Sequence, residues 1–167
     1  MGLINYVTRV QFGYGELATL NAELAIAGIS RPFLVTDKGV RRLGVLDRIQ
    51  SVLDTTPAGV FDETPGNPDE ATVRAAAESF ASVDADGIIA VGGGSALDLA
   101  KAVAILAAHG GALKTYAAIE GGSEKITAAT WPTIAIPTTA GTGSEVGRGA
   151  IIILEDGRKV GLLSPYL

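Results

Sequence analysis

The chain has 167 residues, of which 47% are hydrophobic, so it is long and apolar enough to bury a core, and a disordered chain is excluded. It contains no cysteine and one histidine, which excludes disulfides and thiolate metal sites. Its net charge of −5, without a block of basic residues, argues against nucleic acid as a partner.

Short β-branched runs alternate along the chain with longer stretches rich in alanine and leucine. Strands are expected, in chain order, at residues 6–12, 33–36, 59–61, 87–91, 133–136 and 150–154. Helices are expected at residues 16–27, 38–53, 69–83 and 96–108. This alternation predicts one α/β domain over residues 1–167, with a Rossmann-like parallel sheet flanked by helices.

Local signals refine this pattern. Asp156-Gly157 lies between the apolar runs 150–154 and 160–163, which predicts a β-hairpin near the C-terminus. Asn67 before Pro68 is the expected N-cap of one helix, and Ser95 is the expected N-cap of the next. No apolar run reaches the ~18 residues of a membrane span and no signal peptide is visible, so we expect a cytoplasmic protein without a membrane partner.

Three consecutive glycines, Gly92 to Gly94, join an apolar strand to a helix that begins near Ser95. Glycines at such a junction expose successive backbone amides, and the helix start adds unpaired N–H groups and a positive dipole end. This pattern favours a site for a phosphate or pyrophosphate. The alternative is a tight turn whose glycines only satisfy the backbone geometry. The motif matches neither G-x-G-x-x-G nor the P-loop.

A second polar loop follows the strand at residues 133–136. Thr138, Thr139, Thr142 and Ser144 interleave with small residues there, and hydroxyls and bare amides suit phosphate, ribose and amide groups. A flexible turn is the alternative. Because ligands of open α/β sheets bind beyond the carboxyl ends of the strands, two such loops together favour a nucleotide site.

Asp37 follows the strand at residues 33–36, where a carboxylate can accept hydrogen bonds from a ribose or can cap the next helix. Lys101 and Lys159 are expected at the surface or at a helix end, and His109 beside a helix C-terminus. Trp131 is expected to pack against the core. No Ser or Cys stands in the pattern of a hydrolase nucleophile.

The sequence resembles the iron-containing, or group III, alcohol dehydrogenases. Two long motifs carry the resemblance: Gly92-Gly93-Gly94-Ser95-x-x-Asp98-x-Ala100-Lys101 and Pro137-Thr138-Thr139-Ala140-Gly141-Thr142-Gly143-Ser144-Glu145. Shorter matches fall in the expected order around Gly13, Asp37, Asn67, Lys159 and Pro165.

The resemblance implies a dehydroquinate synthase-like N-terminal domain that binds NAD, with NADP as the alternative, for hydride transfer to or from a small alcohol or aldehyde. It implies that Gly93, Gly94 and Ser95 hold the pyrophosphate and that Asp37 contacts the adenine ribose. By the same resemblance, the remaining cofactor-binding residues are Asn67 near the adenosine, Lys159 near the nicotinamide ribose, Asp98 in the first helical turn, and Thr138, Thr139 and Thr142 along the groove. A homodimer is among the expected assemblies.

One departure from the family is large. The family holds iron or zinc with an Asp and three His on a C-terminal helical domain, and a chain with one histidine cannot supply that set. We therefore expect the cofactor domain alone, with no catalytic or metal-binding residue of its own. Two alternatives stay open: the nucleotide-binding module of a related glycerol dehydrogenase or dehydroquinate synthase-like protein, and a nucleotide-binding module without catalysis.

Overall fold

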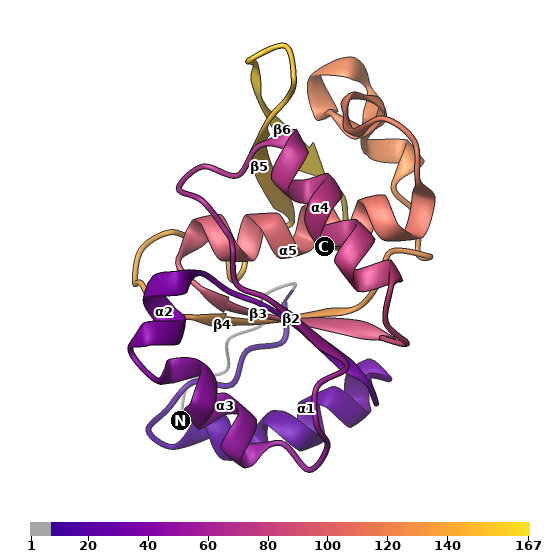
Figure 1. Ribbon diagram of the computed structural model, residues 1–167. Helices are drawn as coiled ribbons and strands as arrows, with labels where there is room; N and C mark the ends of the chain where they lie inside the picture. Colours follow the sequence, from indigo (N-terminus) through magenta and orange to yellow (C-terminus); the bar gives the residue numbers. More distant parts are fainter. Residues whose placement is uncertain (1–7) are drawn as a thin grey trace.

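A parallel sheet of four strands forms the centre of the computed structural model, which describes residues 8–167 (Figure 1). The strands lie in the order β2-β1-β3-β4, and each neighbouring pair is parallel. Their bounds are β1 (Pro32–Val35), β2 (Gly59–Phe61), β3 (Gly87–Gly92) and β4 (Thr133–Pro137). The predicted α/β fold is confirmed, and these four strands match the expected ones to within one residue at either end.

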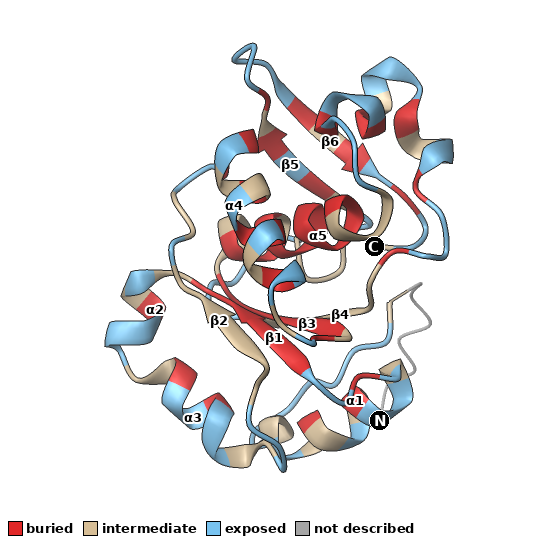
Figure 2. Cartoon of the chain, turned by 45° about the vertical axis from the view of Figure 1, so that its right-hand side comes forward, coloured by how far each residue is buried: buried red, intermediate tan, exposed pale blue. Residues whose placement is uncertain are grey.

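Helices cover both faces of this sheet (Figure 1). One face carries α1 (Leu20–Ala27) and α3 (Val45–Val52), and the other carries α4 (Glu70–Ala81) and α5 (Gly94–His109). The short α2 (Lys38–Arg42) follows β1 directly. Because both faces are covered, β1 and β3 are buried along their whole length (Figure 2).

Two hydrophobic cores result, one on each face. Neighbouring residues of a strand point to opposite faces, so Phe33 and Ile88 join the core with α4 and α5, while Leu34 and Ile89 join the core with α1 and α3. Phe33, Ile88, Leu34 and Ile89 are all fully buried. Burying a side chain of this size stabilises a fold by about 1.5–3 kcal/mol.

The predicted β-hairpin is confirmed and forms a further layer. Strands β5 (Gly149–Ile153) and β6 (Lys159–Leu163) pair antiparallel, and β5 packs against α5 on the side away from the main sheet (Figure 1). Helix α5 is therefore enclosed between the sheet and the hairpin. Its residues Ala96, Leu97 and Leu99–Leu106 are buried all around the helix axis.

Three expectations about helices were wrong. The single helix expected at residues 38–53 is two helices, α2 and α3, because Gly44 has a φ of 71° and takes the left-handed conformation between them. The N-cap of α4 is Asp69, not Asn67, and that of α5 is Gly93, not Ser95. In α4 the Asp69 carboxylate accepts from the Thr72 amide at 2.8 Å, so the N-cap lies two residues later than predicted.

The strand expected at residues 6–12 is not present in its described part. Residues 6 and 7 lie outside the described residues, and residues 8–12 form no strand. Short 3₁₀ turns that were not predicted occur at η1 (Glu16–Thr19), η2 (Leu113–Tyr116), η3 (Ala118–Glu120) and η4 (Gly122–Lys125). From residue 8 onward, no helix is long and apolar enough to cross a membrane.

Candidate functional site

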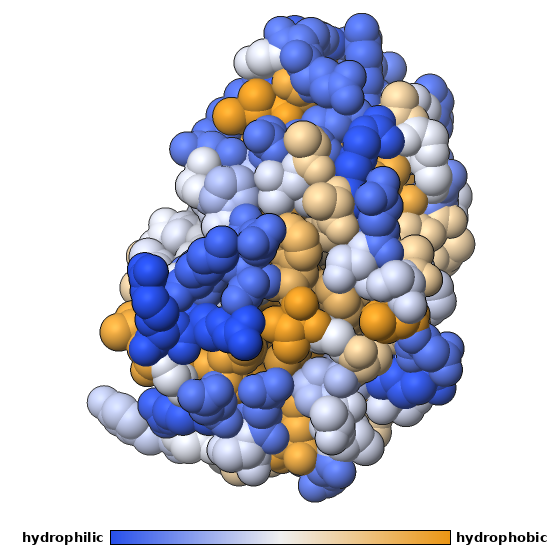
Figure 3. Space-filling view, in the orientation of Figure 1, coloured by the Kyte–Doolittle hydropathy of each residue, from blue (hydrophilic) through white to orange (hydrophobic). Residues whose placement is uncertain are grey.

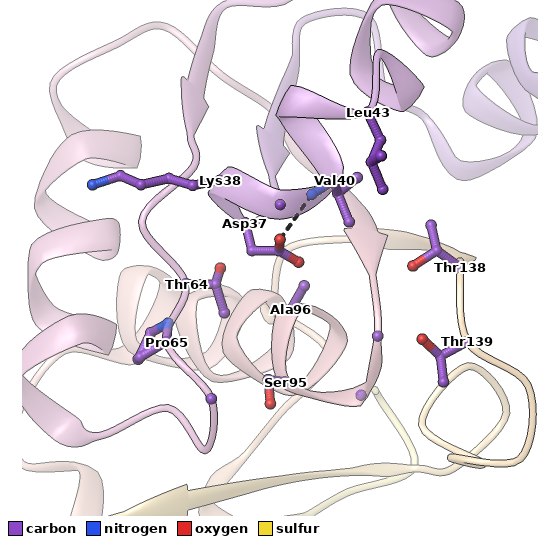
Figure 4. A pocket seen from close by; sticks show the side chains of 14 residues that line it. Asp37, Lys38, Val40, Leu43, Thr64, Pro65, Ser95, Ala96, Thr138 and Thr139 are labelled. Carbon is purple, nitrogen blue, oxygen red and sulfur yellow. Dashed lines mark hydrogen bonds between the residues drawn. The ribbon is translucent and has the colours of Figure 1, made fainter.

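An open cleft of about 590 Å³ lies beyond the carboxyl ends of β1, β3 and β4 (Figure 4). In the order β2-β1-β3-β4, β2 lies on one side of β1, whereas β3 and then β4 follow on the other side. The direction in which successive strands are added to the sheet therefore changes at β1 and β3, and ligands of open α/β sheets bind at such a switch point. The residues that line the cleft are Asp37–Val40, Leu43, Thr64–Gly66, Gly93–Ala96, Thr138 and Thr139.

The floor of the cleft is the glycine turn, residues 92–95. Gly92 ends β3 with a φ of 151°, and a Cβ there would lie 2.7 Å from the Ala96 Cβ, so this position requires glycine. Gly93 and Gly94 have ordinary φ values but little room. A Cβ on Gly93 would lie 3.3 Å from Thr139 Oγ1, and one on Gly94 would lie 3.3 Å from the Thr142 Cβ.

No side chain caps the start of α5, whose N-cap is Gly93. The N–H groups of Ala96 and Leu97 donate to the Gly93 carbonyl, which leaves the first amides of the helix to serve a ligand. The positive end of the helix dipole adds to this effect. The arrangement suits an anion such as a phosphate group.

The threonine loop, residues 138–148, forms the wall beside the glycine turn. Its first amide, that of Thr138, donates to the Gly92 carbonyl at 2.9 Å, so the loop starts next to the turn. Gly141 and Gly143 adopt left-handed conformations with φ values of 89° and 71°. Thr138 and Thr139 are exposed and line the cleft (Figure 4).

Asp37 lies at the end of the cleft that the start of α2 forms. Its Oδ1 accepts from the Val40 amide at 2.9 Å, so the carboxylate caps α2 (Figure 4). Its Oδ2 lies beside the glycine turn, 3.4 Å from where a Cβ on Gly92 would be. The two roles weighed for Asp37, helix cap and acceptor for a ligand, are therefore compatible, because each needs only one carboxylate oxygen.

Apolar residues beside Asp37 complete this end of the cleft. Val40 and Leu43 line it, and Leu43 is 80% exposed. Across the whole face seen in Figure 1, hydrophilic side chains predominate and hydrophobic residues show between them near the middle (Figure 3). An exposed leucine inside a cleft offers a flat apolar ring a surface to pack on.

A polar cluster lies on the hairpin side of the glycine turn. Lys159 Nζ donates to Asn67 Oδ1 at 2.7 Å, and the Asn67 amide donates to Ser95 Oγ at 3.2 Å. Asn67 has a φ of 56°, an unusual conformation for a residue other than glycine. Ser144 Oγ donates to Asp98 Oδ1 at 2.6 Å, and burial raises the pKa of Asp98.

Six of the ten predicted cofactor residues line the cleft itself. They are Asp37, Gly93, Gly94, Ser95, Thr138 and Thr139. The other four, Asn67, Asp98, Thr142 and Lys159, do not line the cleft but connect to the glycine turn or the threonine loop through the contacts described above. Sequence reasoning missed Thr64, whose hydroxyl donates to the Thr36 carbonyl at 2.6 Å and brings residues 64–66 to the cleft. No sequence signal marks that contact.

The expectation for Lys101 was wrong. It is neither at the surface nor at a helix end but is 4% exposed, because the hairpin covers α5 on the side away from the main sheet. By contrast, His109 ends α5 as expected and its Nε2 lies 3.1 Å from Thr130 Oγ1. Trp131 packs against the core as predicted, with its ring 5.5 Å from that of Phe80.

The model of the iron-containing alcohol dehydrogenase family matches residues 7–167. The chain belongs to the iron-containing alcohol dehydrogenase family. The 4-hydroxybutyrate dehydrogenase of Cupriavidus necator is 54% identical over 167 residues, which are 100% of this chain and 44% of that enzyme. The 1,3-propanediol dehydrogenase of Citrobacter freundii is 36% identical over 145 residues, 84% of this chain and 36% of that enzyme.

Solved structures of similar enzymes share the fold. A sulfoacetaldehyde reductase from Bifidobacterium kashiwanohense in complex with NAD+ superposes with a TM-score of 0.85 at 29% identity, covering 100% of this chain and 45% of that one. A 1,3-propanediol oxidoreductase gives a TM-score of 0.84 at 33% identity, covering 93% and 40%. The chain thus spans less than half the length of the relatives it matches.

The family's metal does not fit the residues present. Within residues 8–167, no group of three or more His, Asp or Glu side chains is placed to hold a metal ion. The one histidine of the sequence, His109, bonds to Thr130 at the far end of α5 from the glycine turn. The described residues therefore offer no site through which a metal-dependent step could run.

Proposed function

We propose that residues 1–167 form the NAD-binding domain of a metal-dependent alcohol dehydrogenase. One observation carries the proposal: the glycine turn, the threonine loop and the Asp37 carboxylate come from distant parts of the sequence and meet at one cleft. The NAD complex of the similar sulfoacetaldehyde reductase supports the choice of ligand.

The glycine turn would take the pyrophosphate. The free amides at the start of α5 would donate to its oxygens, and the threonine hydroxyls on the facing wall would add donors. Gly93 and Gly94 would let the backbone approach the phosphates, because any Cβ at either residue would project toward the threonine loop.

The adenosine would lie at the Asp37 end. The free Oδ2 of Asp37 would accept from a ribose hydroxyl, and the exposed Leu43 side chain would pack on the adenine ring. The nicotinamide half would extend past Ser95 toward Lys159 and Asp98. Lys159 would then exchange its bond to Asn67 for one to a ribose hydroxyl.

The reaction proposed for the whole protein is hydride transfer between NAD and a small alcohol or aldehyde, in which a bound iron or zinc ion polarises the substrate oxygen. The metal ligands would come from residues outside this chain. Among alcohols, 4-hydroxybutyrate is the first to test, because the similar enzyme at 54% identity is a 4-hydroxybutyrate dehydrogenase. A cytoplasmic location and a homodimer belong to the same proposal, and light scattering of the purified chain tests the dimer.

Calorimetric titration of the chain with NAD, NADP and ATP tests the cofactor. We expect NAD to bind most tightly of the three, with one site per chain. A chain that prefers ATP, or binds none of the three, would contradict the proposal. Preference for ATP would instead favour a nucleotide-binding module without dehydrogenase chemistry.

A further inference from the structure

Lys101 is a buried cation on α5 whose hydrogen bonds within residues 8–167 all go to backbone oxygens. Its Nζ donates to the carbonyls of Ser144 at 2.6 Å and Gly149 at 3.2 Å, and to that of Gly147. These three contacts use all three ammonium hydrogens. None of the ion pairs found within residues 8–167 includes Lys101.

An ammonium group in this place is costly for the fold. Removing a charge from water carries a large penalty that a carboxylate partner usually offsets. Here the ammonium hydrogen-bonds to carbonyl oxygens, and the Asp98 and Glu145 carboxylates attract it without forming a hydrogen bond to it. Burial accordingly lowers the pKa of Lys101. Every other buried residue of α5 has an alanine, leucine, isoleucine or valine side chain, so packing alone would be served by an apolar residue.

The positions of the three carbonyls indicate the role of the Lys101 ammonium group. Ser144 and Gly147 belong to the threonine loop, and Gly149 is the first residue of β5. The loop is thus held at its C-terminal end by Lys101, at its start by the Thr138 amide, and at Ser144 by the bond to Asp98. Between these points, residues 138–143 are exposed.

The same helix also forms the glycine turn. Helix α5 begins at Gly94, and Lys101 follows about two turns later on the same rigid rod. A contact from Lys101 therefore fixes the threonine loop relative to the first amides of α5. Those are the wall and the floor of the cleft between which the pyrophosphate would lie.

We propose that Lys101 is a positioning residue: it holds the threonine loop against the glycine turn and so preorganises the dinucleotide site without touching the dinucleotide. The inference rests on the proposed NAD-binding function. Because the loop is already ordered, binding of the ligand does not carry the entropy cost of ordering it, and the affinity is higher.

The test is chemical rescue of Lys101→Ala. The substitution removes three methylene groups and the ammonium, which n-propylammonium replaces atom for atom. We expect Lys101→Ala to bind NAD at least about tenfold more weakly than the unchanged chain, a loss of about 1.4 kcal/mol. n-Propylammonium should restore the affinity, whereas 1-propanol, of the same size but uncharged, should not. Lys125→Ala, a substitution of an exposed lysine, is the matched control and should bind as the unchanged chain does.

Hydrogen exchange provides a readout that does not depend on NAD. In Lys101→Met, which keeps an apolar side chain on α5, the amides of residues 138–148 should exchange faster while those of β1 and β3 stay protected. Unchanged loop exchange, or unchanged NAD affinity in Lys101→Ala, would overturn the inference. If the unchanged chain binds no NAD, the proposed function fails, and loop exchange alone then decides whether Lys101 holds the loop.

Discussion

Asp37 uses one carboxylate oxygen to cap α2, so its substitutions can separate the effect on cofactor preference from the effect on helix stability. A 2′-phosphate near the free oxygen would meet like charge, and two unit charges about 4 Å apart at an effective dielectric of ~20 repel by on the order of 4 kcal/mol. We therefore predict that the unchanged chain prefers NAD over NADP.

Asp37→Ser should narrow or reverse that preference while it keeps a capping hydroxyl. Asp37→Gly should do the same at little further cost in stability, since glycine is also accepted at an N-cap. Calorimetric titration with both dinucleotides measures the preference, and thermal unfolding monitors the cap. Equal affinity of the unchanged chain for NAD and NADP would show that Asp37 does not face the ribose.

Gly94 gives a second prediction at the residue scale. Gly94→Val should abolish NAD binding, because the branched side chain would project toward Thr142 and fill the space between the walls. The fold should persist, since the φ of Gly94 is not in the left-handed region. Circular dichroism checks folding and calorimetry checks binding. Gly66→Ala, with open space around the added Cβ, is a milder comparison at the same cleft. Full affinity in Gly94→Val would move the phosphate site elsewhere.

Only some of the residues in and around the cleft could be located from the sequence. The glycine turn and the threonine loop were predictable because each follows an apolar strand, and parallel strands present their carboxyl ends at one edge of a sheet. Lys101 was not predictable, since its burial depends on a hairpin that lies more than forty residues later in the sequence. Asn67 was misread as a cap because Asp69, two residues later, has the same capping chemistry.

At the scale of elements, the start of α4 gives a prediction about pH. Hydrogen bonds from the Thr72 amide and hydroxyl lower the pKa of Asp69 below its ordinary value of 3.8. The cap therefore contributes its full stability above that value and loses it as the pH falls through the lower pKa of the folded state. Asp69→Ala should reduce the free energy of unfolding by about 1 kcal/mol at neutral pH, and by less in acid.

Urea unfolding followed by circular dichroism at about pH 7 and about pH 3 measures this difference. Asp69→Asn is the matched control, because it keeps an oxygen acceptor for the Thr72 amide but cannot titrate. A deficit of Asp69→Ala that is the same at both pH values would show that the ionised carboxylate is not what stabilises the helix start.

Some element boundaries follow from the local sequence and could be predicted, whereas others depend on contacts with distant residues and could not. The strand at residues 59–61 was predicted with the bounds that the structure shows. The hairpin was predicted from Asp156-Gly157, where Gly157 has a φ of 82°. The break between α2 and α3 was missed, although Gly44 was visible, because apolar residues continue at helical spacing on both sides of it. The 3₁₀ turns over residues 113–125 depend on close packing: a Cβ on Gly122 would lie within 2.6 Å of the Thr115 and Tyr116 backbone, and no periodicity reveals that contact.

At the scale of the whole molecule, the last prediction concerns the proposed dehydrogenase, for which this chain offers a candidate cofactor cleft but no metal site within residues 8–167. The purified 167-residue chain should bind NAD but should not oxidise an alcohol. Releasing a hydride from an alcohol requires the loss of its proton, and a bound metal ion makes that loss feasible near neutral pH. A catalytic zinc needs about three protein ligands, whereas this sequence offers one histidine and no cysteine.

The lack of substrate positioning should lower the activity of the chain further. The cleft is open, so within residues 8–167 nothing covers it to hold a substrate against a bound nicotinamide, and correct placement is worth roughly 7–11 kcal/mol of the barrier. An NADH absorbance assay with added Fe²⁺ or Zn²⁺, 4-hydroxybutyrate and a panel of small alcohols should therefore show no turnover. A chimera that joins residues 1–167 to the remainder of the Cupriavidus necator 4-hydroxybutyrate dehydrogenase should recover it, because that enzyme is 54% identical over this region. Metal-dependent turnover by the 167-residue chain alone would place the active site within it and refute this division of the site.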